Sequence, residues 1–123
     1  MTPEKEEKLI NDFPLIWKKN PDIGCNDGWF NLIYTLCNCI QNHIAYHVGD
    51  ASIQLHVIQC KQKFGGLRFY YAGGDDLIRG MIYLAESLSF SICERCGSPG
   101  KTVTNAQGWV ETLCQNHHDE DFK

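Results

Sequence analysis

The chain carries four potential metal ligands near its C-terminal end, in two pairs with the same short spacer. Cys93 and Cys96 are separated by two residues, and Cys114 and His117 repeat that spacing. Thiolate sulfur and imidazole nitrogen are donors that tetrahedral zinc prefers, and four protein ligands are typical of a structural site. The two pairs therefore predict one structural zinc ion with no coordination position left for catalysis.

The fourth ligand has an alternative, because His118 directly follows His117. We favour His117, since its two-residue spacer mirrors that of the first pair. The cysteines could also be buried without metal, or Cys93 and Cys96 could form a thioredoxin-like redox pair. A redox pair is less favoured because no βαβ pattern surrounds Cys93.

The segment around these ligands has the elements of a small zinc finger. Cys93 to Gly97 predicts a tight knuckle, residues 109–113 predict a strand, and Cys114 is expected at the start of a short helix. We expect a treble-clef or ribbon-like finger over residues 91–123. It would be appended to a helix–hairpin–helix body, residues 1–90, within a single domain, because 123 residues suit one core.

The body contains three predicted helices. Thr2 and Pro3 suit a helix start, and Pro14 should end that helix. Asp27 is expected to cap a second helix to about Tyr46, and Asp75 or Asp76 a third to about Phe90. A loop is expected at residues 18–26, and Gly49-Asp50 should follow the second helix. In the third helix, the apolar residues expected in the core are Leu77, Ile78, Met81, Ile82, Leu84, Ala85 and Leu88.

A hairpin is predicted at residues 53–71. Gly65-Gly66 separates two runs of strand-forming residues, and a two-residue turn of this kind needs a positive φ at both positions. With this turn, Lys63 would face Arg68 and Lys61 would face Tyr70. The expected inner side carries Ile58, Cys60, Phe64, Leu67, Phe69 and Tyr71. The fold class is therefore α+β, with helices packed on a small antiparallel hairpin sheet.

The opposite side of this hairpin would be basic. It carries Lys61, Lys63, Arg68 and Tyr70. Like charges that face each other across a ladder are destabilising, so this side is suited to an anion. The anion could be a carboxylate of the chain itself, an acidic protein partner, or a phosphate-bearing ligand such as a nucleotide. A plain solvated face is the simplest alternative.

Other residues give weaker indications. Trp29 could join the basic side in a contact surface, or it could anchor the core. Cys39, His43 and His47 follow at four-residue steps and could bind a second metal. The remaining cysteines, Cys25, Cys37 and Cys60, suit buried positions. No nucleophile elbow, phosphate-binding loop or dinucleotide fingerprint is present, so an enzyme is not expected.

Composition narrows the compartment and the partners. The net charge of −4 disfavours a nucleic-acid binder, although a local basic patch could still bind an anion. No apolar run approaches the length of a membrane span. Residues 1–8 are charged and lack the apolar segment of a signal peptide, and seven cysteines is an odd number. We therefore expect a cytoplasmic protein in a reducing compartment.

Three segments together resemble a family of small uncharacterised proteins from tailed bacteriophages and prophages. They are residues 27–30 (DGWF), residues 61–70 (KQKFGGLRFY) and the finger from Gly108 to His117. Members often carry Glu at the position of Gln62, so this hairpin is more basic than the family pattern. The resemblance implies a phage-type origin and an accessory or host-directed role, but no reaction.

These observations converge on a non-enzymatic binding protein with a structural zinc. The expected partner is a host protein, in host takeover or anti-defence, and the expected contact residues are Lys61, Lys63, Arg68, Tyr70 and Trp29. If the protein is phage-encoded, it would act in the host cytoplasm. The alternatives are sequestration of a small phosphorylated ligand, or nucleic-acid binding through the finger. The sequence gives no oligomeric state.

Overall fold

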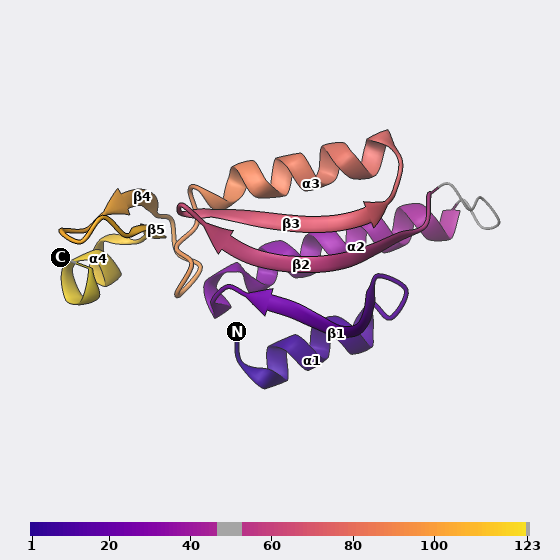
Figure 1. The fold of residues 1–123 in the computed structure, drawn as a ribbon, viewed down its shortest axis with the longest axis horizontal. Helices are drawn as coiled ribbons and strands as arrows, with labels where there is room; N and C mark the ends of the chain where they lie inside the picture. The colour runs from indigo at the N-terminus through magenta and orange to yellow at the C-terminus, as the bar shows by residue number, and fades with distance from the viewer. Residues whose placement is uncertain (47–52, 123) are drawn as a thin grey trace.

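The computed structural model describes residues 1–46 and 53–122, and it has an α+β architecture (Figure 1). The helices gather around a small sheet, and the finger lies beyond one end of that sheet. Along the chain the elements are α1 (Pro3–Asp12), β1 (Trp17–Gly24), the 3₁₀ turn η1 (Asp27–Trp29), α2 (Phe30–Tyr46), β2 (Leu55–Lys63), β3 (Gly66–Gly73), α3 (Asp76–Ser89), β4 (Lys101–Thr104), β5 (Val110–Leu113) and α4 (Gln115–Asp121). The predicted α+β fold class, with helices and small antiparallel sheets, is confirmed.

The larger sheet has the strand order β1-β2-β3, and β4 and β5 form a separate antiparallel pair in the finger. The antiparallel pairing of β2 with β3 was predicted, but β1 was wrongly predicted to be a loop. It pairs in parallel with β2, and its register shifts between Trp17, opposite Val57, and Asp22, opposite Gln59. The irregular stretch contains Pro21, which an edge strand tolerates because one of its sides needs no hydrogen bonds.

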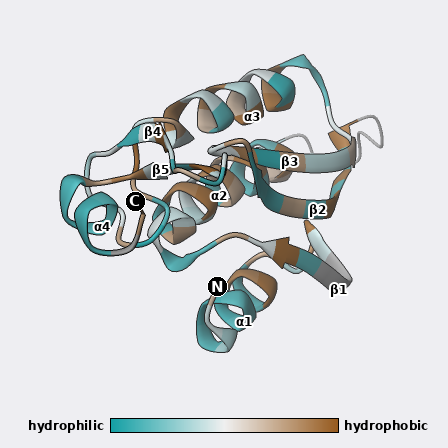
Figure 2. Cartoon of the chain, turned by 60° about the vertical axis from the view of Figure 1, so that its left-hand side comes forward, coloured by the Kyte–Doolittle hydropathy of each residue, from teal (hydrophilic) through white to brown (hydrophobic). Residues whose placement is uncertain are grey.

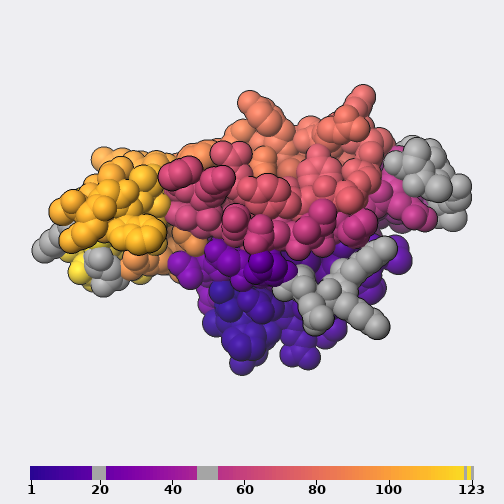
Figure 3. Space-filling model, in the orientation of Figure 1, coloured from indigo at the N-terminus to yellow at the C-terminus, as the bar shows by residue number. Residues whose placement is uncertain are grey.

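The three long helices bury one face of the larger sheet. Their apolar residues and the inward residues of the strands form one core cluster, in which Trp29, Ile33 and Ile78 are fully buried. Figure 2 shows the hydrophobic residues of α2 and α3 among hydrophilic ones, whereas α4 is almost wholly hydrophilic. None of the helices in the described residues covers the other face of the hairpin, which forms the front of the molecule in Figure 3.

The start of α3 follows a local capping rule, whereas the side chain of Thr2 makes no capping hydrogen bond in α1. Thr2 occupies the N-cap of α1, which ends two residues before Pro14. The side chain of Asp75 caps α3 by accepting a hydrogen bond from the Ile78 N–H at 3.0 Å. Asp27 is not the cap of α2, because its carboxylate accepts the Thr2 N–H at 2.8 Å and the chain first forms η1.

α2 runs to Tyr46, as predicted, whereas Gly49-Asp50, expected to follow it, lies outside the described residues. Within the described part of the chain, no helix is both long enough and apolar enough to cross a membrane.

The hairpin turn lies one residue earlier than predicted. Phe64 and Gly65 have φ values of 53° and 87° and form the turn, so Lys63 pairs with Gly66 and Lys61 pairs with Arg68. Phe64 is therefore exposed at the tip instead of facing the core. Tertiary contacts support this turn position: Thr112 Oγ1 donates a hydrogen bond to Gly65 O, and Gly66 packs closely against the ring of Phe90.

Two further core predictions are wrong. Ile58 is exposed because the β2–β3 register shifts between Val57 and Gln59, so that Ile58 is the extra residue of a bulge. In α3 the buried residues are Ile78, Ile82, Ala85 and Ser89. The exposed ones include three leucines that were expected in the core, Leu77, Leu84 and Leu88.

Candidate metal centre

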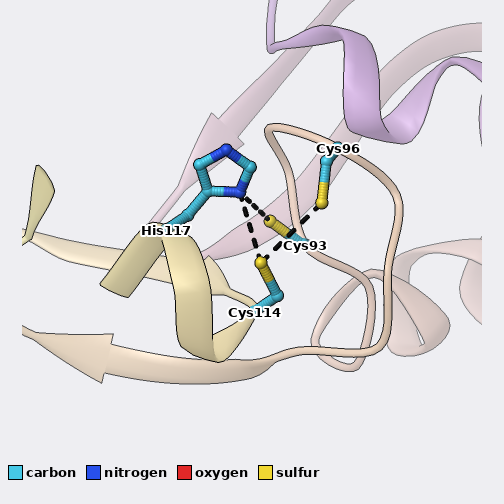
Figure 4. A group of neighbouring side chains, drawn as sticks. All are labelled: Cys93, Cys96, Cys114 and His117. Atoms are coloured by element: carbon cyan, nitrogen blue, oxygen red, sulfur yellow. Dashed lines mark hydrogen bonds between the residues drawn. The ribbon is translucent and has the colours of Figure 1, made fainter. Parts of the chain in front are cut away.

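The four predicted ligands converge at one point in the finger (Figure 4). Cys93 and Cys96 come from the knuckle that follows α3, while Cys114 is the N-cap of α4 and His117 lies in its first turn. Their ligand atoms all lie within 4.8 Å of one another. The group could hold a metal ion.

The distances between these atoms fit a tetrahedral site. Cys96 Sγ lies 3.8 Å from Cys114 Sγ, and His117 Nδ1 lies 3.6 Å from Cys93 Sγ and 3.2 Å from Cys114 Sγ. Metal–sulfur and metal–nitrogen bonds of the lengths that zinc makes require edges of about 3.8 Å and about 3.6 Å in a regular tetrahedron. Donor types and spacing therefore both suit a four-coordinate ion.

Backbone hydrogen bonds shape the knuckle around its two sulfurs. The Gly97 N–H donates to Cys93 O at 2.9 Å, and the Cys93 N–H donates to Ser98 O at 2.7 Å. Hydrogen bonds from the Ser98 side chain and then from its backbone lower the pKa of the Cys96 thiol to about 6. Cys96 is thus mostly a thiolate at neutral pH, which is the form that binds metal.

The ligands span the boundary between interior and solvent. Cys93 is buried, Cys114 and His117 are half-buried, and Cys96 is exposed. His118, the alternative fourth ligand, instead lies with its Nδ1 3.5 Å from the carboxylate of Asp119. The geometry therefore selects His117.

The knuckle is attached to the body through residues 26–29. The Gly28 N–H donates to Glu94 O at 2.7 Å, and the Trp29 indole N–H donates to Ile92 O at 2.9 Å. A side chain on Gly28 would collide with the carbonyl oxygens of Cys93 and Glu94. Burial raises the pKa of Glu94, and the Asn26 N–H, which Glu94 accepts at 3.0 Å, opposes this shift. We call this contact the knuckle joint.

A second attachment joins the hairpin tip to β5 of the finger. Thr112 Oγ1 donates to Gly65 O at 2.7 Å, and Gln62 Nε2 donates to Val110 O at 2.7 Å. Thr112 is fully buried, and Gly65 is packed against side chains of β4 and β5. We call this contact the tip joint. The contacts of Gly28 and Gly65 thus hold the finger against the body. The sequence analysis did not predict these contacts, although each glycine stands beside an aromatic residue, Trp29 or Phe64.

The predicted contact residues do not all lie together. Lys61, Lys63, Arg68 and Tyr70 occupy the uncovered face of the hairpin, as expected. Lys61 lies across the ladder from Arg68, and its Nζ is 5.8 Å from the centre of the Tyr70 ring. Trp29 is fully buried and cannot belong to a contact surface, because its ring packs in the core and its N–H serves the knuckle joint.

Only part of the possible second metal site, Cys39, His43 and His47, lies in the described chain. His43 Nε2 lies 2.7 Å from the Asp75 carboxylate, so this histidine links α2 to the N-terminus of α3. His47 lies outside the described residues. Of the other cysteines, Cys25, Cys37 and Cys60 are buried in the core, as expected.

Comparisons with protein-family models, curated proteins and solved structures each find no match to this chain. Residue chemistry and geometry therefore carry the functional argument. The phage-type resemblance of its three motifs stays a prediction.

Proposed function

We propose that this chain is a non-enzymatic binding protein in which a structural zinc holds the finger and the uncovered hairpin face binds an acidic protein partner. One observation carries the proposal. Lys61, Lys63 and Arg68 lie on a sheet face that no helix covers, and among the described residues none of them forms an ion pair.

Zinc is the ion that suits the metal centre best. Three sulfurs and one imidazole nitrogen match its preference for tetrahedral, soft-donor sites. Four protein ligands leave no position for a reacting water, which supports a structural role. The order knuckle, β4–β5 hairpin and ligand-bearing α4 supports a treble-clef-like finger.

The charge of the hairpin face argues for recognition. Lys61 and Arg68 stand directly opposite each other, an arrangement that destabilises a ladder unless an anion relieves it. Asp22, which lies opposite Gln59 on the neighbouring strand β1, accepts a hydrogen bond from the Gln59 side chain. The chain has a net charge of −4, so this face is a local concentration of positive charge on a chain that is negative overall.

The shape of this face favours a protein over a small ligand. Its cations project from a sheet, and two larger clefts of the described residues, beside Pro14 and beside Asp27, are lined by other residues. Exposed Ile58 and Phe64 add apolar area next to the charges. Aromatic and apolar groups rimmed by charge are typical of protein interfaces.

The motif resemblance supports a phage accessory protein as the source and a host protein as the partner. The second candidate ligand is a nucleotide. It is favoured by the position of Lys61 above the Tyr70 ring with Arg68 opposite, which offers a stacking surface beside two phosphate-binding cations.

The test is affinity capture from a bacterial lysate with the zinc-loaded protein as bait. We expect acidic proteins to bind the wild type, and Lys61→Glu with Arg68→Glu to weaken their binding at least about tenfold, because both cations would repel the partner. Arg79→Glu with Lys101→Glu is the matched control, since both residues are exposed and lie off this face. That double variant should retain the partner.

Equal capture by wild type and the hairpin variant, with thermal unfolding unchanged, would exclude the hairpin face as the contact surface. A dialysis arm with ATP separates the two candidates. Saturable ATP binding that Tyr70→Ala removes, without protein capture, would replace the protein partner by a nucleotide.

A further inference from the structure

The candidate metal centre contains two cysteines from different elements that lie close enough to react with each other. Cys96 Sγ, in the knuckle, lies 3.8 Å from Cys114 Sγ, at the N-cap of α4 (Figure 4). The sulfurs of a disulfide lie about 2 Å apart, so these two atoms would have to approach by about another 2 Å. Oxidation and metal binding therefore compete for the same pair of residues.

Both cysteines of this pair can be reached from solvent. Cys39 and Cys96 are the exposed members of the seven cysteines, and Cys39 lies outside the metal centre. Cys114 is half-buried and lines a cleft of about 260 Å³ beside Pro99. The third cysteine of the centre, Cys93, is fully buried. A small oxidant would therefore meet Cys96 first and would find Cys114 next to it.

The surroundings of Cys93 make it a poor partner for this reaction. Its backbone N–H donates to Ser98 O at 2.7 Å, which fixes the main chain of the knuckle at this point. Its side chain belongs to the small core of the finger, together with Leu113 and Phe122. Moving this sulfur outward would break that core, so the geometry favours Cys114 as the second reacting cysteine.

We propose that Cys96 and Cys114 form a disulfide when a hydroperoxide reaches the finger, and that this bond releases the metal ion. The inference rests on the zinc centre of the proposed function and adds a way in which that centre is regulated.

The reaction has two steps. The Cys96 thiolate attacks one oxygen of the peroxide, so that an S–O bond forms, the O–O bond breaks and hydroxide leaves. The Cys114 thiolate then attacks the Cys96 sulfur, so that the S–S bond forms, the S–O bond breaks and a second hydroxide leaves. Two protons from solvent convert the two hydroxides to water. The two sulfurs together lose two electrons, and the peroxide gains them.

Loss of these two thiolates removes half of the ligand set. The thiolate is the form of cysteine that binds metal, so the disulfide leaves only Cys93 and His117 as ligands. The new bond still joins the knuckle to the start of α4, because Cys96 and Cys114 come from these two elements. A thiol reductant breaks the bond by exchange and restores both ligands. The oxidised finger therefore loses its ion but keeps a covalent link.

The test treats the zinc-loaded protein with hydrogen peroxide. A coloured chelator measures the zinc released, and mass spectrometry of peptides identifies the disulfide. We expect one zinc ion to be released for each Cys96–Cys114 disulfide, and a thiol reductant with added zinc to reverse both changes. Cys39→Ser is the matched control, because it removes the other exposed cysteine and should release zinc at the wild-type rate.

Native mass spectrometry before oxidation separates this inference from the proposed function. A chain that never binds zinc would contradict the structural zinc of the proposed function. The disulfide identified after peroxide treatment would still decide whether Cys96 and Cys114 are the reacting pair.

Cys114→His separates metal binding from oxidation. Two cysteines and two histidines also bind zinc in a tetrahedral site, but this variant lacks the second sulfur of the proposed disulfide. Peroxide should therefore release its zinc at least about tenfold more slowly than that of the wild type. A Cys93–Cys96 disulfide in the oxidised wild type, zinc release without any disulfide, or release from Cys114→His at the wild-type rate would overturn the proposal.

Discussion

The body and the finger of this protein are stabilised by different means. The body has a core cluster of 18 buried residues, whereas the cluster of the finger consists of Cys93, Leu113 and Phe122. A segment as short as residues 93–122 cannot bury enough apolar surface to fold alone. We therefore expect the finger to depend on a metal ion at the candidate centre and on the two joints, while the body depends on the hydrophobic effect.

Metal removal should give the largest loss of stability, and it should affect the finger but not the body. Chelation, or Cys96→Ser, should unfold residues 93–122, because a structural zinc contributes on the order of 10 kcal/mol to folding. The body should keep its secondary structure. Hydrogen exchange measured segment by segment would show protection lost in β5 and α4 and retained in α2 and β2.

Cys39→Ser is the matched control for that experiment. Cys39 is an exposed cysteine outside the metal centre, so its variant should retain one zinc ion in native mass spectrometry. A fully protected finger in the metal-free protein would show that packing alone suffices there.

A change at the knuckle joint should give the next largest effect. In Gly28→Ala the new methyl group would collide with the backbone of Cys93 and Glu94, and the hydrogen bond from the Gly28 N–H would be displaced. We expect a loss of about 1–3 kcal/mol, as for other overpacked sites. Urea unfolding of the zinc-loaded protein would measure it, followed by the NMR signal of the Trp29 indole N–H, which is separate from the signals of Trp17 and Trp109.

Gly108→Ala provides the contrast. Gly108 has φ +86°, but a Cβ there would meet nothing within 4 Å. Its variant should suffer only local backbone strain within the finger, of about 1 kcal/mol, and should leave the environment of Trp29 unchanged. Equal shifts of the Trp29 signal in both variants would mean that Gly28 does not link the two regions.

Acid should produce the smallest effect, and that effect belongs to the body. Hydrogen bonds from His43 and then from the Ile78 N–H lower the pKa of Asp75 below its ordinary value of 3.8. The ionised carboxylate is therefore favoured in the folded state. The stabilisation of the folded state by this carboxylate is present above pH 3.8 and is lost as the pH falls through the lowered pKa of Asp75.

Asp75→Asn should flatten this acid step in a plot of unfolding free energy against pH. Asp76→Asn, at the exposed next position, is the control and should leave the step in place. An identical acid step in Asp75→Asn would assign it to other carboxylates, of which Asp12 is the first choice because Tyr34 and Lys8 lower its pKa as well.

The sequence predicted what depends on local chemistry. The ligand set follows from two short spacers, and the starts of α1 and α3 follow from Pro3 at the first helical position and from the Asp75 cap, because both involve neighbouring residues. β1 was missed because it forms only against β2, far along the chain. The position of the hairpin turn was not predicted because its contacts are made with distant residues. Thr112 donates a hydrogen bond to Gly65, and Phe90 packs against Gly66. Trp29 gave no sign of whether it faced solvent or Ile92.

The tip joint has a mechanical consequence. The strand β2, which carries Lys61 and Lys63, ends two residues before Gly65, whose carbonyl oxygen accepts a hydrogen bond from Thr112, two residues before the ligand Cys114. We expect that loosening the metal centre would break the hydrogen bond from Thr112 to Gly65 and change the spacing of the cations on the hairpin. We therefore expect that loss of a bound zinc ion would also weaken the proposed binding of a partner to the hairpin face.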